Sequence, residues 1–233
     1  MSQYNDVKFH IESVKILSHK ADCMVNYAKN CISNHKLVLE DDSEEYSYMF
    51  CVNSSLHRGY FHPSPVYDLI IGNTRRGRFV RNGENYSHRY VLDNVGKLKY
   101  VESYRNGRIS YVEHLQYDES TIIGITIDQK GRLAAVCEET YIDSKISSFI
   151  LVNCLFNEGN YVIFNIRAEN FYYDSKGLSE CAFRSISPSS GFQINKHYAF
   201  ERKDGFLVSY TDTLDCPTND TKKTFQIAKR RKA

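Results

Sequence analysis

The residues whose types and spacing are best suited to binding or catalysis surround the dipeptide Asn106-Gly107. Asn-Gly is the strongest short signal for a two-residue type I′ hairpin turn, because both of its residues accept a positive φ. Counting outward from such a turn pairs position 105 with 108, 104 with 109, 102 with 111 and 100 with 113. One face of the predicted hairpin then carries two glutamates among tyrosines: Tyr100, Glu102, Tyr104, Tyr111 and Glu113.

This face suggests three kinds of chemistry. Tyrosine offers a large, rigid contact area with a polar tip, so the face is a candidate binding surface for a basic partner. Diagonal neighbours on paired strands lie about 7 Å apart or less, so Glu102 and Glu113 also form a candidate carboxylate pair for glycoside hydrolysis. The plainest interpretation is structural, with both acids bonded to tyrosine hydroxyls or arginines at the rim of a sheet.

Charge runs elsewhere in the chain add further candidates. Residues 40–45 are almost all acidic and repel one another, which predicts an exposed loop. Asp41, Asp42 and Glu44 therefore join the partner-binding candidates. Arginines cluster at 75–81 and lysines and arginines at 222–232. We interpret these as a solvated turn and a solubilising tail, with phosphate or RNA contact and a targeting signal as the alternatives.

The histidines and cysteines form no recognised metal motif. His19 and Cys23 are spaced to share one side of a helix, as are Cys31 and His35, but two helical turns separate the pairs. His57 lies in a Pro-containing loop without partner cysteines. We predict no metal site.

Nucleotide and nucleophile motifs are equally weak. The glycines at 72 and 77 have the spacing of a phosphate-binding loop, but Arg78-Phe79 stands where that loop needs Lys followed by Ser or Thr. Cys137 and His114 can act as a Cys–His pair only if the fold brings them together. We predict no cofactor and no catalytic residue.

Composition bounds the class of protein. The chain has 233 residues, of which 42% are hydrophobic, and this suits one β-rich domain with a small appendage. A net charge of +2 argues against a dedicated nucleic-acid binder. Seven widely spaced cysteines without a C-x-x-C motif, and the absence of an apolar leader or spanning run, favour a cytoplasmic protein with reduced thiols.

Hydrophobic periodicity predicts a mainly β fold, an antiparallel meander forming a twisted sheet, a sandwich or a partly closed barrel. Alternation predicts strands over 7–17, 35–39, 46–52 and 66–71, and near-helical spacing predicts a helix over 20–33. From residue 92 to 213, strands alternate with glycine turns. The predicted turn glycines are Gly83, Gly96, Gly107, Gly131, Gly159, Gly177 and Gly205. The predicted divisions are an N-terminal strand and helix portion over 1–45, the meander over 46–216 and a flexible basic tail over 217–233.

Several turns continue into a basic and then an aliphatic residue, as in Gly107-Arg108-Ile109 and Gly131-Arg132-Leu133. With their tyrosine-rich strands, Asn94 to Tyr117 and Asp128 to Val136 loosely resemble cytosolic immunity proteins of bacterial polymorphic and contact-dependent toxin systems, and the tyrosine repeats of Rhs-type proteins. The resemblance implies a stoichiometric inhibitor that covers a toxin's active site without catalysis. Glu102, Glu113 and the acidic run at 40–45 would then face a basic nuclease.

The sequence therefore predicts an intracellular, non-enzymatic protein that binds another protein. Two alternatives remain: a viral or host-interaction β protein in which the basic tail is a targeting signal, and a hydrolase that uses Glu102 and Glu113.

Overall fold

The computed structural model describes residues 13–34, 37, 45–53, 57, 59–60, 64–66, 77–81, 85–203, 206–215 and 221–226. Its helix and strands are α1 (Val14–Ser33), β1 (Ser47–Val52), β2 (Arg78–Val80), β3 (His88–Leu92), β4 (Leu98–Arg105), β5 (Arg108–Asp118), β6 (Thr121–Asp128), β7 (Leu133–Ile142), β8 (Lys145–Asn157), β9 (Asn160–Asp174), β10 (Gly177–Ser187), β11 (Phe192–Lys203), β12 (Phe206–Asp215) and β13 (Thr221–Gln226).

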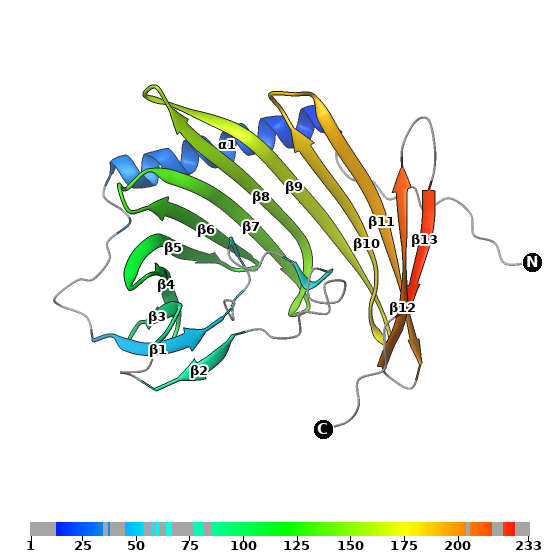
Figure 1. Ribbon diagram of the computed structural model, residues 1–233, viewed down its shortest axis with the longest axis horizontal. Helices are drawn as coiled ribbons and strands as arrows, with labels where there is room; N and C mark the ends of the chain where they lie inside the picture. The colour runs from blue at the N-terminus through cyan, green and yellow to red at the C-terminus, as the bar shows by residue number, and fades with distance from the viewer. Residues whose placement is uncertain are drawn as a thin grey trace, which may run out of the picture.

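The strands form one 13-stranded antiparallel sheet that curls without closing (Figure 1). From β3 to β13 each strand pairs with the next one in the chain. β1 departs from this order because it pairs with both β3 and β2, which leaves β2 and β13 at the two edges. The predicted mainly β meander is confirmed, as an open sheet rather than a sandwich or barrel. Among the described residues no helix is long and apolar enough to cross a membrane.

The two faces of the sheet carry different packing. We call the face that α1 covers the outer face, and strand register places on it Tyr100, His114, Ile125, Val136, Val152 and Ile166. The buried stripe of α1, which includes Leu17, Ala21 and Ala28, packs against the four aliphatic side chains of that row. Each fully buried aliphatic side chain contributes about 1.5–3 kcal/mol, so this contact is the main attachment of the helix. Figure 1 shows α1 lying across the strands.

The opposite, inner face is covered in part by residues between β1 and β2. We call them the inner-face segment: His57, Gly59, Tyr60, Ser64, Pro65 and Val66. Val66 is buried with Phe149, Phe171 and Tyr198 in a second apolar cluster. The sheet is thus packed on both faces, by a helix outside and by this segment inside.

The predicted turns are confirmed wherever the structure describes them. Asn106 and Gly107 have φ of 53° and 73°, as a type I′ turn requires, and Glu158 and Gly159 follow with 48° and 84°. Turns also fall at Gly96, Gly131 and Gly177, between the strands they were predicted to join. The turns predicted at Gly83 and Gly205 involve residues outside the described ranges.

The N-terminal prediction is wrong at one boundary. The predicted strand over 7–17 loses its second half to α1, which begins at Val14. The Ser13 side chain accepts a hydrogen bond from the Ile16 N–H at 3.4 Å and so caps the helix. Leu17 then joins the buried stripe, and its burial under the sheet overrides the local alternation.

The predicted flexible tail is also wrong in part. Thr221–Gln226 forms β13, which pairs with β12, and the Phe225 ring stacks on Tyr210 at 4.9 Å between centroids. The remainder of 217–233 lies outside the described residues, as do most of the strands predicted over 35–39 and 66–71.

Candidate functional site

The hairpin at Asn106-Gly107 contains a β-bulge that the sequence did not reveal. Near the turn the register is as predicted, with Arg105 opposite Arg108 and Tyr104 opposite Ile109. Ser103 then pairs with Tyr111, which leaves Ser110 as an extra residue in β5. One extra residue on a strand of period two moves every following side chain to the other face.

The predicted glutamate pair is therefore wrong. Glu102 pairs with Val112 on the outer face, while Glu113 pairs with Val101 on the inner face. Both side chains are buried, with 2% and 0% of their surface exposed. Two carboxyl groups on opposite faces cannot flank one glycosidic bond, and buried ones cannot present an acidic surface to a partner.

The five hairpin candidates are divided in the same way. Tyr100, Glu102 and Tyr104 lie on the outer face, whereas Tyr111 and Glu113 lie on the inner face. Tyr100 is buried, and Tyr104 and Tyr111 are half-buried. The other candidates, Asp41, Asp42 and Glu44, lie outside the described residues.

Glu102 has a structural role on the outer face. The Arg89 guanidinium donates to both of its oxygens, from Nε at 2.6 Å and from a terminal nitrogen at 2.7 Å. The Tyr104 hydroxyl donates to it at 2.6 Å. Such a bidentate ion pair is strong and geometrically specific. The partners of Glu102, an arginine and a tyrosine hydroxyl, are those expected from the structural interpretation of this residue.

Glu113 fastens the inner-face segment to the sheet. One of its oxygens is 2.8 Å from Nε2 of His57, and the other accepts the Tyr60 backbone N–H at 2.7 Å. The Cys137 thiol also points to this second oxygen, at 3.6 Å. We call Glu113 and these partners the Glu113 centre.

Two glycines make room for the Glu113 carboxyl group. A Cβ added at Gly59 would lie 2.4 Å from Glu113 Oε1, and Gly59 also has a φ of 137°. A Cβ added at Gly124 would lie 2.6 Å from the Cys137 sulfur and 2.7 Å from Glu113 Oε1. All three distances are far shorter than real contacts, so the centre depends on glycine at both positions.

A second buried glutamate, Glu169, holds the same segment farther along the sheet. The Arg167 guanidinium lies 2.5 Å from one oxygen, and the Ser64 hydroxyl donates to the other. The Cys181 thiol is 3.9 Å from this second oxygen. We call this group the Glu169 centre. Sequence reasoning missed it, although opposite charges two residues apart on a buried strand, Arg167 and Glu169, were a usable signal.

Burial shifts the pKa of two thiols and two histidines of this sheet toward the uncharged form. Burial, followed by the neighbouring glutamates, raises the pKa of the Cys137 and Cys181 thiols well above the ordinary value. Burial lowers the pKa of His88 and of His114 to about 4. His114 is on the outer face and Cys137 on the inner, so the fold does not make a Cys–His pair.

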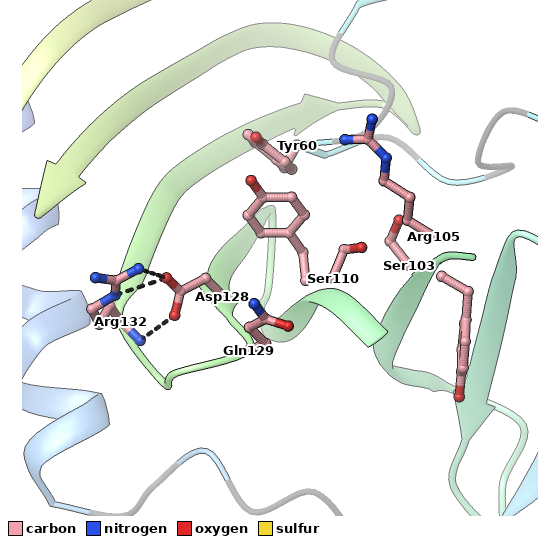
Figure 2. A pocket seen from close by; sticks show the side chains of 9 residues that line it. Tyr60, Ser103, Arg105, Ser110, Asp128, Gln129 and Arg132 are labelled. Carbon is pink, nitrogen blue, oxygen red and sulfur yellow. Dashed lines mark hydrogen bonds and ion pairs between the residues drawn. The ribbon is translucent and has the colours of Figure 1, made fainter. Parts of the chain in front are cut away.

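The inner face is hollowed beside the β4–β5 hairpin. A cavity of about 650 Å³ lies there, and a second of about 420 Å³ adjoins it and shares Arg105, Ser110 and Gln129. We call the two together the hairpin hollow. Figure 2 shows Arg105, Ser103 and Ser110 near one another and the Asp128–Arg132 pair on the other side. The charged and amide side chains of the lining are Arg105, Asn106, Arg108, Asp128, Gln129 and Arg132.

Asp128 is already neutralised within this lining. The Arg132 guanidinium donates to one of its oxygens at 2.6 and 2.8 Å, and the backbone N–H groups of Lys130 and Arg132 donate to the other. Burial alone would raise the pKa of the Asp128 carboxyl group, but these hydrogen bonds lower it below the ordinary value. Arg105 and Arg108 have no such partner among the described residues.

Four apolar side chains are exposed at the end of the sheet where these hairpins turn, and register places three of them, Leu155, Val162 and Phe192, on the inner face. We call them the apolar group: Leu155, Val162, Phe164 and Phe192. Leu155 and Val162 are register partners, Phe164 occupies a bulge of β9, and Phe192 pairs with Ser187. Their exposed fractions are 55%, 43%, 39% and 61%. The apolar residues that run into the Asn157–Asn160 turn from both sides were the sequence signal for this group.

The remaining sequence candidates do not assemble into a site. His19 and Cys23 lie 3.8 Å apart on the exposed side of α1, but Cys31 is buried against the sheet. Within the described ranges no group of three or more His, Cys, Asp or Glu side chains is placed to hold a metal ion. Arg78 and Arg81 are exposed, and Arg75 and Arg76 lie outside those ranges.

The chain was also compared with known proteins. No family model matches it, and no curated protein matches it.

Proposed function

We propose that this chain is a non-enzymatic binding protein that recognises another protein with the inner face of its sheet. The observation that carries the proposal is the exposed apolar group on β8, β9 and β11. Monomeric proteins rarely expose large apolar patches, and those that do use them for contacts with partners or ligands. Aromatic anchors such as Phe164 and Phe192 commonly dominate the energy of such contacts.

The position of this group supports the proposal. The turns at Gly107, Gly131, Gly159 and Gly191 all lie at one end of the meander, because consecutive hairpins alternate ends. The apolar group and the hairpin hollow therefore share this end, and Leu155, Val162 and Phe192 also share the inner face with the hollow. Apolar anchors beside polar, hydrogen-bonding side chains are the usual composition of a protein interface.

We further propose that binding inhibits the partner by covering its active site, as in the immunity proteins that the sequence loosely resembles. A wide sheet held rigid by packing on both faces suits this role, since it can cover a site without changing shape. We place the protein in the cytoplasm, where its thiols stay reduced. Six cysteines of the described residues are free thiols: Cys23, Cys31, Cys51, Cys137, Cys154 and Cys181.

The test begins with a partner captured from the native cell and identified by mass spectrometry, followed by titration calorimetry with the purified partner. Phe164→Ser combined with Phe192→Ser should weaken binding by at least about a hundredfold, because each is a candidate hot spot. The matched control is Val95→Ser with Ile142→Ser. These residues are 80% and 63% exposed and lie at the opposite end of the sheet. Unchanged affinity in the first variant, or equal loss in both, would contradict the proposal.

A further inference from the structure

We propose that the hairpin hollow is an anion site that takes the clustered carboxylates of an acidic segment of the protein partner. This inference rests on the proposed function, because it assigns a chemistry to the part of the interface next to the apolar group. It also reverses the expectation from sequence, which was an acidic surface on this chain facing a basic partner.

The balance of charge in the hollow is positive. Three arginines and one aspartate line it: Arg105, Arg108, Arg132 and Asp128. Arg132 and Asp128 bind each other at 2.6 Å and so cancel. Two guanidinium groups, those of Arg105 and Arg108, are left over with no carboxylate among the described residues.

The placement of these two arginines makes them unusual. They are direct partners across the turn, and both are exposed. Like charges directly opposite on paired strands are destabilising, so the hairpin carries a repulsion that its own fold does not relieve. A bound anion between the two side chains would relieve it. Arginine suits this role because its planar fork matches the geometry of a carboxylate.

The remaining lining offers hydrogen bonds to the same ligand. The bulge adds Ser110 to the lining beside Ser103, and Gln129 contributes an amide from the neighbouring turn. Tyr60 and Tyr111, whose ring centroids are 5.8 Å apart, form an aromatic wall. Figure 2 shows Ser103, Ser110 and Arg105 grouped on one side of the hollow. Cationic forks, hydroxyl groups and tyrosine rings together suit a polar, acidic peptide.

Size and surroundings favour an acidic peptide over a free phosphate or a nucleic acid. The two cavities, of about 650 and 420 Å³, exceed the volume of a small anion. The exposed apolar group nearby suits a protein chain, and a net charge of +2 is small for a nucleic-acid binder.

The probe is a short capped oligoglutamate peptide carrying a fluorophore, titrated with the full-length protein at low salt. A capped oligoglutamine of the same length is the neutral control. We expect saturable binding of the first only, and its affinity should fall as salt is added, since the contacts are ionic. Arg105→Gln with Arg108→Gln should weaken binding by about ten- to a hundredfold, because each removes charge-assisted hydrogen bonds.

A matched variant tests whether any pair of surface charges has the same effect. Lys176→Gln with Lys203→Gln removes two exposed positive charges far from the hollow and should leave binding unchanged. The arginine variant should also melt no lower than the wild type, because it removes the opposed charges of the hairpin. Equal loss in both variants, or binding that survives loss of both arginines, would overturn the site.

Two further arms separate the possible ligands and the two proposals. Inorganic phosphate or a single-stranded oligonucleotide that binds the hollow more tightly than oligoglutamate would overturn the choice of an acidic peptide. Phe164→Ser with Phe192→Ser should still bind oligoglutamate as the wild type does. Loss of partner binding in that variant supports the proposed function alone, whereas absence of oligoglutamate binding in the wild type contradicts only this inference.

Discussion

The Glu113 and Glu169 centres perform the same structural task with different chemistry. Each places a fully buried carboxyl group on the inner face, and each holds one part of the inner-face segment. Glu169 has a permanent cation, Arg167, within 2.5 Å. Glu113 instead meets a histidine, a backbone N–H and a thiol. The first centre is therefore built on an arginine–carboxylate ion pair, while the second has no arginine or lysine among its contacts.

This difference predicts which centre tolerates change. An ion pair with a buried member is damaged most by loss of one partner, because the other charge is left uncompensated. Glu113 is held by a histidine, a backbone N–H and a thiol, so its loss breaks hydrogen bonds but leaves no arginine or lysine without its partner. The Glu113 centre is instead vulnerable to crowding, since two glycines lie against its carboxyl group, and to acid, since buried His88 interacts electrostatically with Glu113.

The largest expected effect is the loss of Glu169. Glu169→Ala should lower the free energy of unfolding by about 3–5 kcal/mol, with the lower end favoured because Arg167 keeps some access to water. Glu113→Ala should cost about 1–3 kcal/mol, the cost of leaving buried hydrogen-bond donors without an acceptor. Urea unfolding of both variants and the wild type measures the difference. The comparison fails if Glu113→Ala costs as much as Glu169→Ala.

Acid should cause the next largest decrease in the free energy of unfolding. The pKa of His88 in the folded protein is about 4, lowered by burial from an ordinary value of 6.5. The unfolded chain therefore binds more protons between these pH values, and the stability that neutral His88 contributes is present above pH 6.5 and lost as pH falls toward 4. The loss amounts to about 3 kcal/mol at most.

His114 should respond to acid in the same direction, because burial lowers its pKa to about 4 as well. Its ring packs on Tyr100 with centroids 5.6 Å apart, and its Nε2 has no partner among the described residues. His114→Phe should keep the packing and reduce the loss of unfolding free energy between pH 7 and pH 4.5. Stability profiles of equal slope for the variant and the wild type would show that His114 does not carry this effect.

Crowding of the Glu113 centre should have a smaller effect. Gly124→Ala places a methyl group against the Cys137 sulfur and the Glu113 carboxyl group, and overpacking of this kind costs about 1–3 kcal/mol. Cys137→Ala should relieve part of the crowding. A double-mutant cycle in urea should therefore give a lower cost for Gly124→Ala in the Cys137→Ala background. Additive costs would mean that the alanine methyl group does not press on the thiol.

The last prediction concerns the rate at which the two buried thiols, Cys137 and Cys181, react with an alkylating reagent, and it involves the smallest effect on stability. The thiolate is the reactive form of cysteine, and both Cys137 and Cys181 have a pKa raised well above the ordinary value by burial. Both should resist iodoacetamide in the folded protein, whereas exposed Cys23 should react readily. Site-resolved mass spectrometry during labelling measures this. Fast labelling of Cys137 alone would show that the Glu113 centre opens more often than the Glu169 centre.

Sequence reasoning predicted the meander well because hairpin turns are local. Asn106-Gly107 and Glu158-Gly159 can be interpreted without knowing what surrounds them, and alternation between turns then marks the strands. The start of α1 could not be predicted in the same way, since burial of Leu17 beneath a sheet built from residues more than a hundred positions later decides it.

The prediction that Glu102 and Glu113 share one face was wrong for a different reason. A bulge at Ser110 has no glycine or other sequence mark, yet it moves Glu113 to the face opposite Glu102. The partners of Glu113 come from positions 57–60 and 137, and no pattern within the hairpin reports them. Buried carboxyl groups depend on such distant partners, so their role follows from the fold and not from their neighbours in sequence.

The most direct test of the proposed binding surface is amide hydrogen exchange of the protein alone and in complex with its purified partner. Protection on binding should appear in 155–164 and 192–194, which carry the apolar group, and in 103–110, which carry the hairpin hollow. The turns at the opposite end, near Val95 and Ile142, should exchange at unchanged rates. Protection confined to that opposite end, or to the exposed side of α1, would contradict the assignment of the inner face as the binding surface.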